Sequence, residues 1–449
     1  MESRALLERI RGDGVEFINL QFTDVLGAMK GVTIPTDKVA EACERGIWFD
    51  GSSIEGFTRI HESDMVLHPD LRTYCVLPWG GAGHRHARLI CDVFKPDGSP
   101  FEGDPRQVLH RVLNRAEQMG YTFMTGPELE FFLFKKNGER RGADVPLRPV
   151  PHDVGGYFDF SPQDLASEVR ADIMRALEKM GMSGETAHHE VATAQHEIDI
   201  KYADALTAAD NVMSLRQTIK AVAAQHELYA TFMPKPLFGI NGTGMHVHQS
   251  LFHPDGENAF FDGGDAHKLS QPAFQFIAGQ LEHASALTAV VAPTVNSYKR
   301  LTPGYEAPVY VCWAHTNRSA LIRVPSYSPG REQSVRCELR CPDPSANPYL
   351  AFAVMLAAGL DGIEKQMSAP SAIEGDVYHF SEGQLDELGI TCLPGTLEEA
   401  LAELEKDSVI QEALGSHAYE AFMRAKWAEW NDYRIQVTDW ELKRYLETI

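Results

Sequence analysis

The chain has 449 residues, a length that favours two or three domains over a single compact core. Its 44% apolar and 23% charged residues are typical of globular proteins and exclude extensive disorder and fibrous repeats. The 63 acidic and 41 basic residues give a formal net charge of -22, which repels phosphate backbones and anionic lipid. We therefore expect neither nucleic acid nor a membrane as a partner.

The N-terminal segment MESRALLERIRGDG carries charged residues every few positions, so it lacks the pattern of a signal peptide. The longest apolar run, residues 350–360, is too short to span a bilayer. We therefore expect a cytoplasmic protein. Seven cysteines without a CxxC pair favour buried, reduced thiols over a zinc site or disulfide bonds.

The first elements of the chain are predicted to be strands. Residues 18–22, in which Ile, Leu and Phe alternate with polar residues, and residues 87–94 both have a strand pattern. Residues 95–105 contain three prolines and two glycines, which is typical of a linker. We therefore predict an N-terminal domain at residues 1–104 and a larger domain at residues 105–449.

The larger domain mixes predicted helices with predicted strands, so its expected class is α+β. Residues 161–181 have the clearest helical pattern, with Ser161 as an N-cap and a glycine at the end. One apolar stripe follows this helix at the expected spacing: Leu165, Val169, Ile173 and Leu177. Further helices are predicted at about residues 205–226, 270–290, 345–366 and 408–430.

Three strand-like segments of the larger domain carry ionisable residues at alternate positions. They contain Glu128 and Glu130, His246 and His248, and Arg336, Glu338 and Arg340. Because residues i and i+2 of a strand point to the same face, each segment would present its charged groups on one surface. Solvated strands alternate in the same way, but three segments with opposite charges favour a shared site.

A further pair of carboxylates, Glu190 and Glu197, lies seven residues apart. With His246 and the three glutamates named above, they make five carboxylates and one imidazole. Two carboxylates about 6–7 Å apart repel by roughly 2–3 kcal/mol at an effective dielectric near 20, so a converging cluster requires cations. Such ligands suit Mg²⁺ or Mn²⁺ better than zinc, and six is the number that two metals would share. HEVAT is not a zinc-protease motif, because Thr193 stands where the second histidine is needed.

Five arginines lie within 41 residues of this acidic chain: Arg300, Arg318, Arg323, Arg336 and Arg340. Guanidinium groups bind phosphate and carboxylate through paired hydrogen bonds, and arginines beside divalent metals are typical of phosphoryl transfer. No Gly-Lys dipeptide occurs, so a Walker A loop is absent, and GGAG at residues 80–83 is predicted to be an ordinary loop.

Two loop segments contain a carboxylate with either a structural or a functional role. Asp50 precedes a Gly-Ser-Ser turn, which its side chain could simply cap. Glu306 lies between Pro303 and Pro308 on a short loop that is either an ordinary surface turn or a lid.

Seven segments in order along the chain resemble type I glutamine synthetase. They are FDGSSIEGF, GPELEFFLF, HHEVATAQHEID, FMPKPLFGINGTGMHVHQSL, RLTPGYEAPV, NRSALIRVP and ELRCPDPSANPYLAFA. The resemblance runs from about residue 15 to the C-terminus. It implies an N-terminal β-grasp domain, a catalytic domain with a curved antiparallel sheet, and a dodecamer of two stacked hexameric rings with active sites between subunits. The implied reaction joins ammonia to L-glutamate with ATP, through γ-glutamyl phosphate.

The same resemblance implies a role for each site residue. The implied ligands of the first metal are Glu130, Glu190 and Glu197, and those of the second are Glu128, His246 and Glu338. The implied glutamate site contains Asn241, Gly242, Arg300 and Arg340, with Glu306 as its lid. The implied phosphate site contains Arg318, Arg323 and Arg336, and further nucleotide contacts come from Glu185, His248 and Ser250. Ammonium would be bound by Tyr157 and by Asp50 of a neighbouring subunit, and Asp50 would accept its proton.

The chain departs from the family pattern in two loops. Residues 313–316 read WAHT where relatives often carry a longer polar stretch, and residues 326–335 lack a lysine that some relatives place near the nucleotide. The length resembles the shorter subgroup without the insertion of adenylylated members. We therefore expect glutamine feedback through Arg59 rather than adenylylation of Tyr378. Small regulatory proteins are a further expected class of partner.

Three other functions are compatible with parts of this pattern. A γ-glutamyl ligase for an amine would keep the metal and phosphate residues, but Asp50, Ser53 and Tyr157 together favour ammonia. A non-catalytic relative would usually lose metal ligands, whereas all six are present. A two-metal phosphatase is the third alternative.

Overall fold

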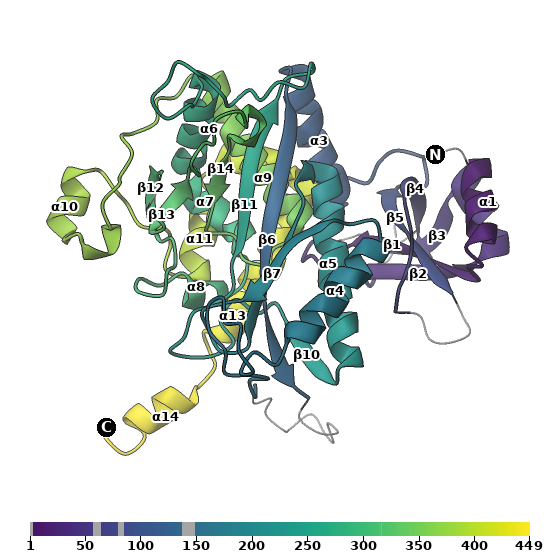
Figure 1. Cartoon of the computed structure of the whole chain (residues 1–449), viewed down its shortest axis with the longest axis horizontal. Helices are drawn as coiled ribbons and strands as arrows, with labels where there is room; N and C mark the ends of the chain where they lie inside the picture. Colours follow the sequence, from purple (N-terminus) through teal and green to yellow (C-terminus); the bar gives the residue numbers. More distant parts are fainter. Residues whose placement is uncertain (1–2, 57–63, 80–84, 137–148, 316) are drawn as a thin grey trace.

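The computed structural model describes residues 3–56, 64–79, 85–136, 149–315 and 317–449. Its strands form two sheets, a smaller one with α1 beside it and a larger one that carries most of the helices (Figure 1). The smaller sheet has the order β2-β1-β5-β4-β3, in which only β1 and β5 are parallel. Its elements are α1 (Ser3–Gly12), β1 (Phe17–Thr23), β2 (Met29–Pro35), α2 (Val39–Arg45), β3 (Ile47–Asp50), β4 (Asp64–Val76) and β5 (His86–Phe94).

Both strands predicted in the N-terminal segment are confirmed. Ile18, Leu20 and Phe22 of β1 are buried while the residues between them are half-buried, as the alternation predicts. The second prediction corresponds to β5. Leu6 and Ile10 of α1 share one apolar cluster with these strands, so the helix covers one face of the sheet.

Among the described residues, the larger sheet has nine strands, in the order β12-β13-β14-β11-β6-β8-β7, with β9 and β10 also pairing with β6. All of its pairs are antiparallel except β12 with β13. The strands are β6 (Thr122–Lys135), β7 (Gly184–His189), β8 (Gln195–Ile200), β9 (Ala203–Asp204), β10 (Leu228–Thr231), β11 (Met245–Phe252), β12 (Tyr310–Ala314), β13 (Ala320–Arg323) and β14 (Cys337–Leu339).

Helices accompany the larger sheet along the rest of the chain. They are α3 (Pro105–Gln118), α4 (Ser167–Lys179), α5 (Ala205–Gln225), α6 (Gln271–Glu282), α7 (Ala284–Val291), α8 (Ser297–Arg300), α9 (Pro348–Glu364), α10 (Glu382–Glu387), α11 (Leu397–Leu404), α12 (Ser408–Leu414), α13 (Ser416–Tyr433) and α14 (Asp439–Tyr445). No helix within the described part of the chain combines the length and apolarity that a bilayer crossing requires.

The helix prediction for residues 161–181 was wrong at its start, because α4 begins at Ser167. Asp164 accepts a hydrogen bond from the backbone of Ala166 and pairs with Arg170, which fixes a turn before the helix. Leu165, the first residue of the predicted stripe, is therefore exposed, whereas the rest of the stripe is buried.

Two other predicted helices are each divided in the structure. The helix predicted at 270–290 is α6 and α7, which meet at His283. The helix predicted at 408–430 is α12 and α13, separated by Gly415, whose φ of 74° ends the first helix. The predictions at 205–226 and 345–366 are confirmed as α5 and α9.

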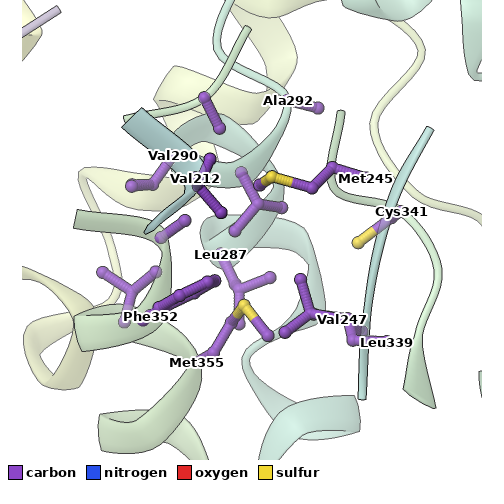
Figure 2. Packing of buried hydrophobic residues seen from close by; sticks show 14 of the residues in the cluster. Val212, Met245, Val247, Leu287, Val290, Ala292, Leu339, Cys341, Phe352 and Met355 are labelled. Carbon is purple, nitrogen blue, oxygen red and sulfur yellow. The ribbon is translucent and has the colours of Figure 1, made fainter. Parts of the chain in front are cut away.

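The main core lies between the larger sheet and the helices that cover it (Figure 2). Met245 and Val247 of β11 and Leu339 of β14 belong to the same buried cluster as Leu287 of α7 and Phe352 of α9. Because strand residues alternate between faces, burying this set directs the ionisable residues of β11 and β14 to the opposite face.

All seven cysteines are free thiols. Five are buried, as predicted, but Cys43 is half-buried and Cys392 is exposed. Both lie outside the apolar strand segments, so nothing in the local pattern of the chain buries them.

A buried ion-pair cluster around Arg106 of α3 links the smaller sheet to helices α3 and α5. Its guanidinium pairs with Asp70 of β4 at 2.9 Å, Asp92 of β5 at 2.8 Å and Asp210 of α5 at 3.0 Å, and its side chain is 3% exposed. Removing this arginine would leave these carboxylates without their shared cation.

We expect Arg106→Met to lower the free energy of unfolding by about 3–5 kcal/mol, measured by urea unfolding. Arg72→Met is the matched control, because Arg72 also pairs with Asp70 but is 71% exposed. The control should cost at most about 1 kcal/mol. Equal losses of unfolding free energy in Arg106→Met and Arg72→Met would contradict a stabilising role specific to the buried cluster.

His283 should make stability depend on pH. Its ring contacts Asp407 at 2.6 Å and Asp361 at 3.0 Å. Burial lowers the pKa of His283, but the hydrogen bonds to Asp407 and Asp361 outweigh burial and raise it. Since the folded-state pKa exceeds the unfolded value of about 6.5, the stabilisation is fully present below that pH and is lost as pH rises through the folded-state pKa.

We therefore expect wild type to lose stability relative to His283→Gln between about pH 6 and about pH 8.5, measured by urea unfolding at both values. His379→Gln, at a side chain that is 85% exposed, is the control and should leave the pH profile unchanged. A pH-independent difference between wild type and His283→Gln would contradict this account.

Candidate active site

Strand register brings the predicted site residues together. Antiparallel pairing of β6 with β11 sets Glu128 opposite His246, and pairing of β6 with β8 sets Glu130 opposite Glu197. Residues opposite each other on neighbouring strands have Cβ atoms within about 5.5 Å. Three segments that are far apart in sequence therefore place their ionisable groups on one face of the sheet.

The same face continues through β14 and β13. His248 of β11 lies opposite Glu338 of β14, and Glu338 lies opposite Arg323 of β13. The acidic and basic parts of the predicted site thus meet at Glu338.

This face opens into a polar cavity of about 270 Å³. All six predicted metal ligands line it: Glu128, Glu130, Glu190, Glu197, His246 and Glu338. Other predicted site residues that line it are Tyr157, Asn241, Gly242, Arg300, Glu306, Arg318, Arg323 and Arg340. The cavity therefore combines a dense group of carboxylates with a group of arginines.

The carboxylates on the β8 side repel one another. Glu130 accepts hydrogen bonds from the Gln195 side chain at 2.7 Å and the Gly244 backbone at 2.9 Å. Burial and the nearby Glu190 charge nevertheless raise the pKa of Glu130 to about 8. Burial and the charge of Glu130 likewise raise the pKa of Glu197. A cation among these groups would favour their carboxylate forms at neutral pH.

The carboxylates on the β14 side are already paired. Glu128 contacts His248 at 2.7 Å and His246 at 3.5 Å. Burial raises the pKa of Glu128, but the hydrogen bonds with the two histidines outweigh burial and lower it. Glu338, which is fully buried, binds Arg340 at 2.9 Å and also binds Arg323.

The donor set fits divalent cations. At this site, ligand atoms lie within 4.8 Å of one another in three groups: Glu128 with His248 and Glu338, His188 with Glu190 and Glu197, and Glu128 with Glu197 and Asp199. Carboxylate oxygens with single imidazole nitrogens are the ligands that Mg²⁺ and Mn²⁺ accept.

Sequence reasoning missed several residues that line the cavity, among them His188, Gln195 and Asp199. Two of them could have been found with the alternation rule. Gln195 lies two residues before Glu197 and Asp199 lies two residues after it on β8, so each shares a strand face with an identified residue. His188 carried no signal of this kind, because Glu190 follows the end of β7 and His188 lies opposite Glu197 only through the pairing of β7 with β8.

Several of the arginines are held by hydrogen bonds within the chain. Arg300 donates to the backbone carbonyls of Cys341 at 2.8 Å and Arg340 at 3.0 Å. Arg336 does not line the cavity but donates to His248 at 3.1 Å. Among these groups only Arg318 is largely exposed to the cavity opening.

The remaining predicted residues lie at the edges of this face or away from it. His248 and Ser250 are on β11, and Ser250 is buried, while Glu185 on β7 is exposed. Asp50 ends β3 in the smaller sheet and does not line the cavity of its own chain; its side chain accepts from the Ser52 backbone. Arg59 lies outside the described residues.

The space around Gly244 shows how tightly the site is packed. A Cβ at this position would lie 2.7 Å from the Arg300 guanidinium and 2.9 Å from the His246 ring. Neither group can move freely, because Arg300 is fixed by backbone carbonyls and His246 lies against Glu128.

We expect Gly244→Ala to lower kcat/KM by roughly 100-fold, because a displacement near 1 Å has that effect in an organised site. Gly383→Ala, where a Cβ would meet nothing within 4 Å, is the control. Activity close to wild type in Gly244→Ala would contradict the described packing.

Comparisons with known proteins agree with this geometry. The family of the glutamine synthetase catalytic domain matches residues 102–445, and that of the glutamine synthetase β-grasp domain matches residues 14–96. A glutamine synthetase from Halobacterium salinarum is 54% identical over 445 residues, covering 99% of this chain and 96% of that protein. One from Thermus thermophilus is 53% identical over 447 residues, covering 99% and 98%. The chain belongs to the glutamine synthetase family.

Solved structures of this family share the fold. A structure described as a GmaS/ADP complex has a TM-score of 0.87 at 35% identity, covering 98% of this chain and 99% of that chain. A Plasmodium falciparum glutamine synthetase has a TM-score of 0.87 at 26% identity, covering 99% of each chain. The predictions of a β-grasp N-terminal part, an α+β class and a type I glutamine synthetase are confirmed.

Glutamine synthetases are ligases that use ATP and a divalent metal, with glutamate and ammonium as the other substrates. This chain is accordingly an enzyme of ATP-dependent glutamine synthesis.

Proposed function

We propose that the cavity holds two Mg²⁺ or Mn²⁺ ions and that ATP, L-glutamate and ammonium react beside them through γ-glutamyl phosphate. The observation that carries this proposal is the convergence of five glutamates and one histidine, from four strands and the loop between β7 and β8, on one arginine-lined cavity. We assign Glu130, Glu190 and Glu197 to one ion and Glu128, His246 and Glu338 to the other. When bound, the ions supply positive charge beside the transferring phosphoryl group.

The arginines in and beside the cavity divide between the two anionic substrates. Arg300 and Arg340, with Asn241 and Gly242, hold glutamate, because their guanidinium groups are already fixed by the chain and match a carboxylate. Arg318, Arg323 and Arg336 compensate the charge that develops on the phosphoryl group as the glutamate side chain attacks. The site extends toward the nucleotide through Glu185, His248 and Ser250.

Water must be excluded from the site, because it would hydrolyse the acyl phosphate before ammonia attacks. We assign this role to Glu306, which lines the cavity and is bound by the Asn241 side chain at 3.1 Å. Ammonium is protonated at neutral pH and cannot attack as a cation. Tyr157 and Asp50 of a neighbouring copy would bind it, and Asp50 would accept its proton.

Because Asp50 does not reach the cavity of its own chain, this assignment requires an oligomer. We assign a dodecamer with sites between subunits, which light scattering of the purified protein would test. We also assign the cytoplasm as its location, glutamine feedback involving Arg59 as its control, and small regulatory proteins as further partners. The two units are placed at residues 1–104 and 105–449.

The direct test is ADP release with glutamate, in the presence and absence of ammonia, with glutamine measured in parallel. We expect ADP and glutamine in equal amounts with ammonia. Preference for methylamine over ammonia would contradict the choice of nucleophile. Phosphate release without glutamine would contradict the ligase proposal altogether.

A further inference from the structure

The segment of residues 370–378, between α9 and α10, contacts the chain on both sides of Arg318. Trp313 donates to the carbonyl of Pro370 at 2.7 Å, and the backbone of Ile373 donates to the carbonyl of Trp313 at 2.9 Å. The backbone of Val377 donates to the Ser319 hydroxyl at 3.2 Å.

Two further hydrogen bonds lie between the contacts of Trp313 and those of Ser319. The Glu374 carboxylate accepts from the backbone of His315 at 3.0 Å, and the Asn317 side chain donates to the carbonyl of Gly375 at 2.5 Å. The segment that carries Arg318 is therefore fixed against residues 370–378 on each side of the arginine.

The same segment reaches the Glu306 loop through one side chain. The Tyr378 hydroxyl donates to the carbonyl of Ala307 at 2.6 Å. Ala307 is buried and directly follows Glu306. Tyr378 is itself fixed, because Asp376 accepts from its backbone at 3.1 Å and its ring packs against Tyr310.

The Glu306 backbone needs such support. Its φ of 56° lies in the left-handed region, which residues other than glycine rarely adopt unless surrounding contacts hold them there. The hydrogen bond from Asn241 holds the Glu306 side chain, and the bond from Tyr378 holds the next peptide group but one, which joins Ala307 to Pro308.

We infer that Tyr378 is a positioning residue that fixes the Glu306 loop relative to the Arg318 segment. With both held, Glu306 can close over glutamate while Arg318 compensates the charge on the phosphoryl group. This inference rests on the proposed function. Burial raises the pKa of Tyr378 to about 12, so its hydroxyl remains a donor at neutral pH.

Loss of the Tyr378 hydrogen bond would have one chemical consequence, which is hydrolysis of γ-glutamyl phosphate. With the loop held, ammonia attacks the acyl carbon of γ-glutamyl phosphate, the bond from that carbon to the phosphate oxygen breaks, and glutamine and phosphate form. With the loop loosened, water attacks the same carbon, the same bond breaks, and glutamate and phosphate form. The net result is ATP hydrolysis, so ADP exceeds glutamine.

The test is Tyr378→Phe, which removes only the hydroxyl. We expect ADP to exceed glutamine by roughly two-fold or more, and the KM for glutamate to rise more than the KM for ATP. Amide hydrogen exchange in residues 302–309 should be faster than in wild type. Tyr419→Phe, on α13, is the control and should keep ADP and glutamine equal.

Equal ADP and glutamine in Tyr378→Phe, or unchanged exchange in residues 302–309, would overturn the inference. Wild type that releases ADP without glutamine would instead overturn the proposed function, so the two failures are distinguishable. A Tyr378→Phe variant that melts well below wild type and retains equal ADP and glutamine at a lower temperature would assign Tyr378 to stability alone and would also overturn it.

Discussion

Glu338→Gln is expected to lower glutamine synthesis by at least about 100-fold and to weaken Mn²⁺ binding, since removal even of groups that only support metal ligands costs roughly 10–100-fold. Glu338 is fully buried, and its carboxylate lies 3.7 Å from His246 while it binds Arg340 and Arg323. The Glu338→Gln substitution keeps the shape of the side chain. It removes the negative charge that a bound cation, Arg340 and Arg323 would share.

The measurements for Glu338→Gln are kcat/KM at saturating Mn²⁺ and the Mn²⁺ affinity by calorimetry. Glu364→Gln is the matched control, because Glu364 pairs with Arg115 on the surface and is 42% exposed. The control should retain activity and affinity, since exposed ion pairs contribute little. Wild-type Mn²⁺ affinity in Glu338→Gln would contradict its assignment as a ligand.

Arg318→Ala should separate phosphoryl transfer from metal binding. We expect ADP formation to fall by roughly 100- to 1,000-fold, the usual loss when one group that stabilises transition-state charge is removed. The Mn²⁺ affinity should stay the same or increase, because the change removes a positive charge from the neighbourhood of the glutamates.

Pre-steady-state ADP release and Mn²⁺ calorimetry on the same protein check this result. Arg331→Ala provides a control on an exposed segment that does not line the cavity. Loss of Mn²⁺ affinity in parallel with ADP formation would assign Arg318 a structural role and contradict its place at the phosphoryl group.

Local patterns were sufficient to predict which faces of the strands carry the site. Alternation in β6 and β11 separated the buried set from Glu128 and His246, and it would also have identified Asp199. Local patterns could not predict that His246 lies opposite Glu128, because pairing of distant strands depends on how their apolar faces pack in the whole domain.

Other features depend on contacts that no local pattern contains. The late start of α4 follows from the pairing of Asp164 with Arg170. The ligand groups also differ in detail from the expectation, since His248 lies closer to Glu128 than His246 does. The position of Tyr378 against the Glu306 loop joins segments 71 residues apart, so it becomes visible only in three dimensions.

The most direct test of the two-cation site is the stoichiometry of Mn²⁺ binding to the purified protein, measured by calorimetry with thermal unfolding in parallel. We predict two ions per chain, a rise in melting temperature on binding, and loss of one ion in Glu338→Gln and of the other in Glu130→Gln. Binding of no ion, or two ions retained in both variants, would contradict it.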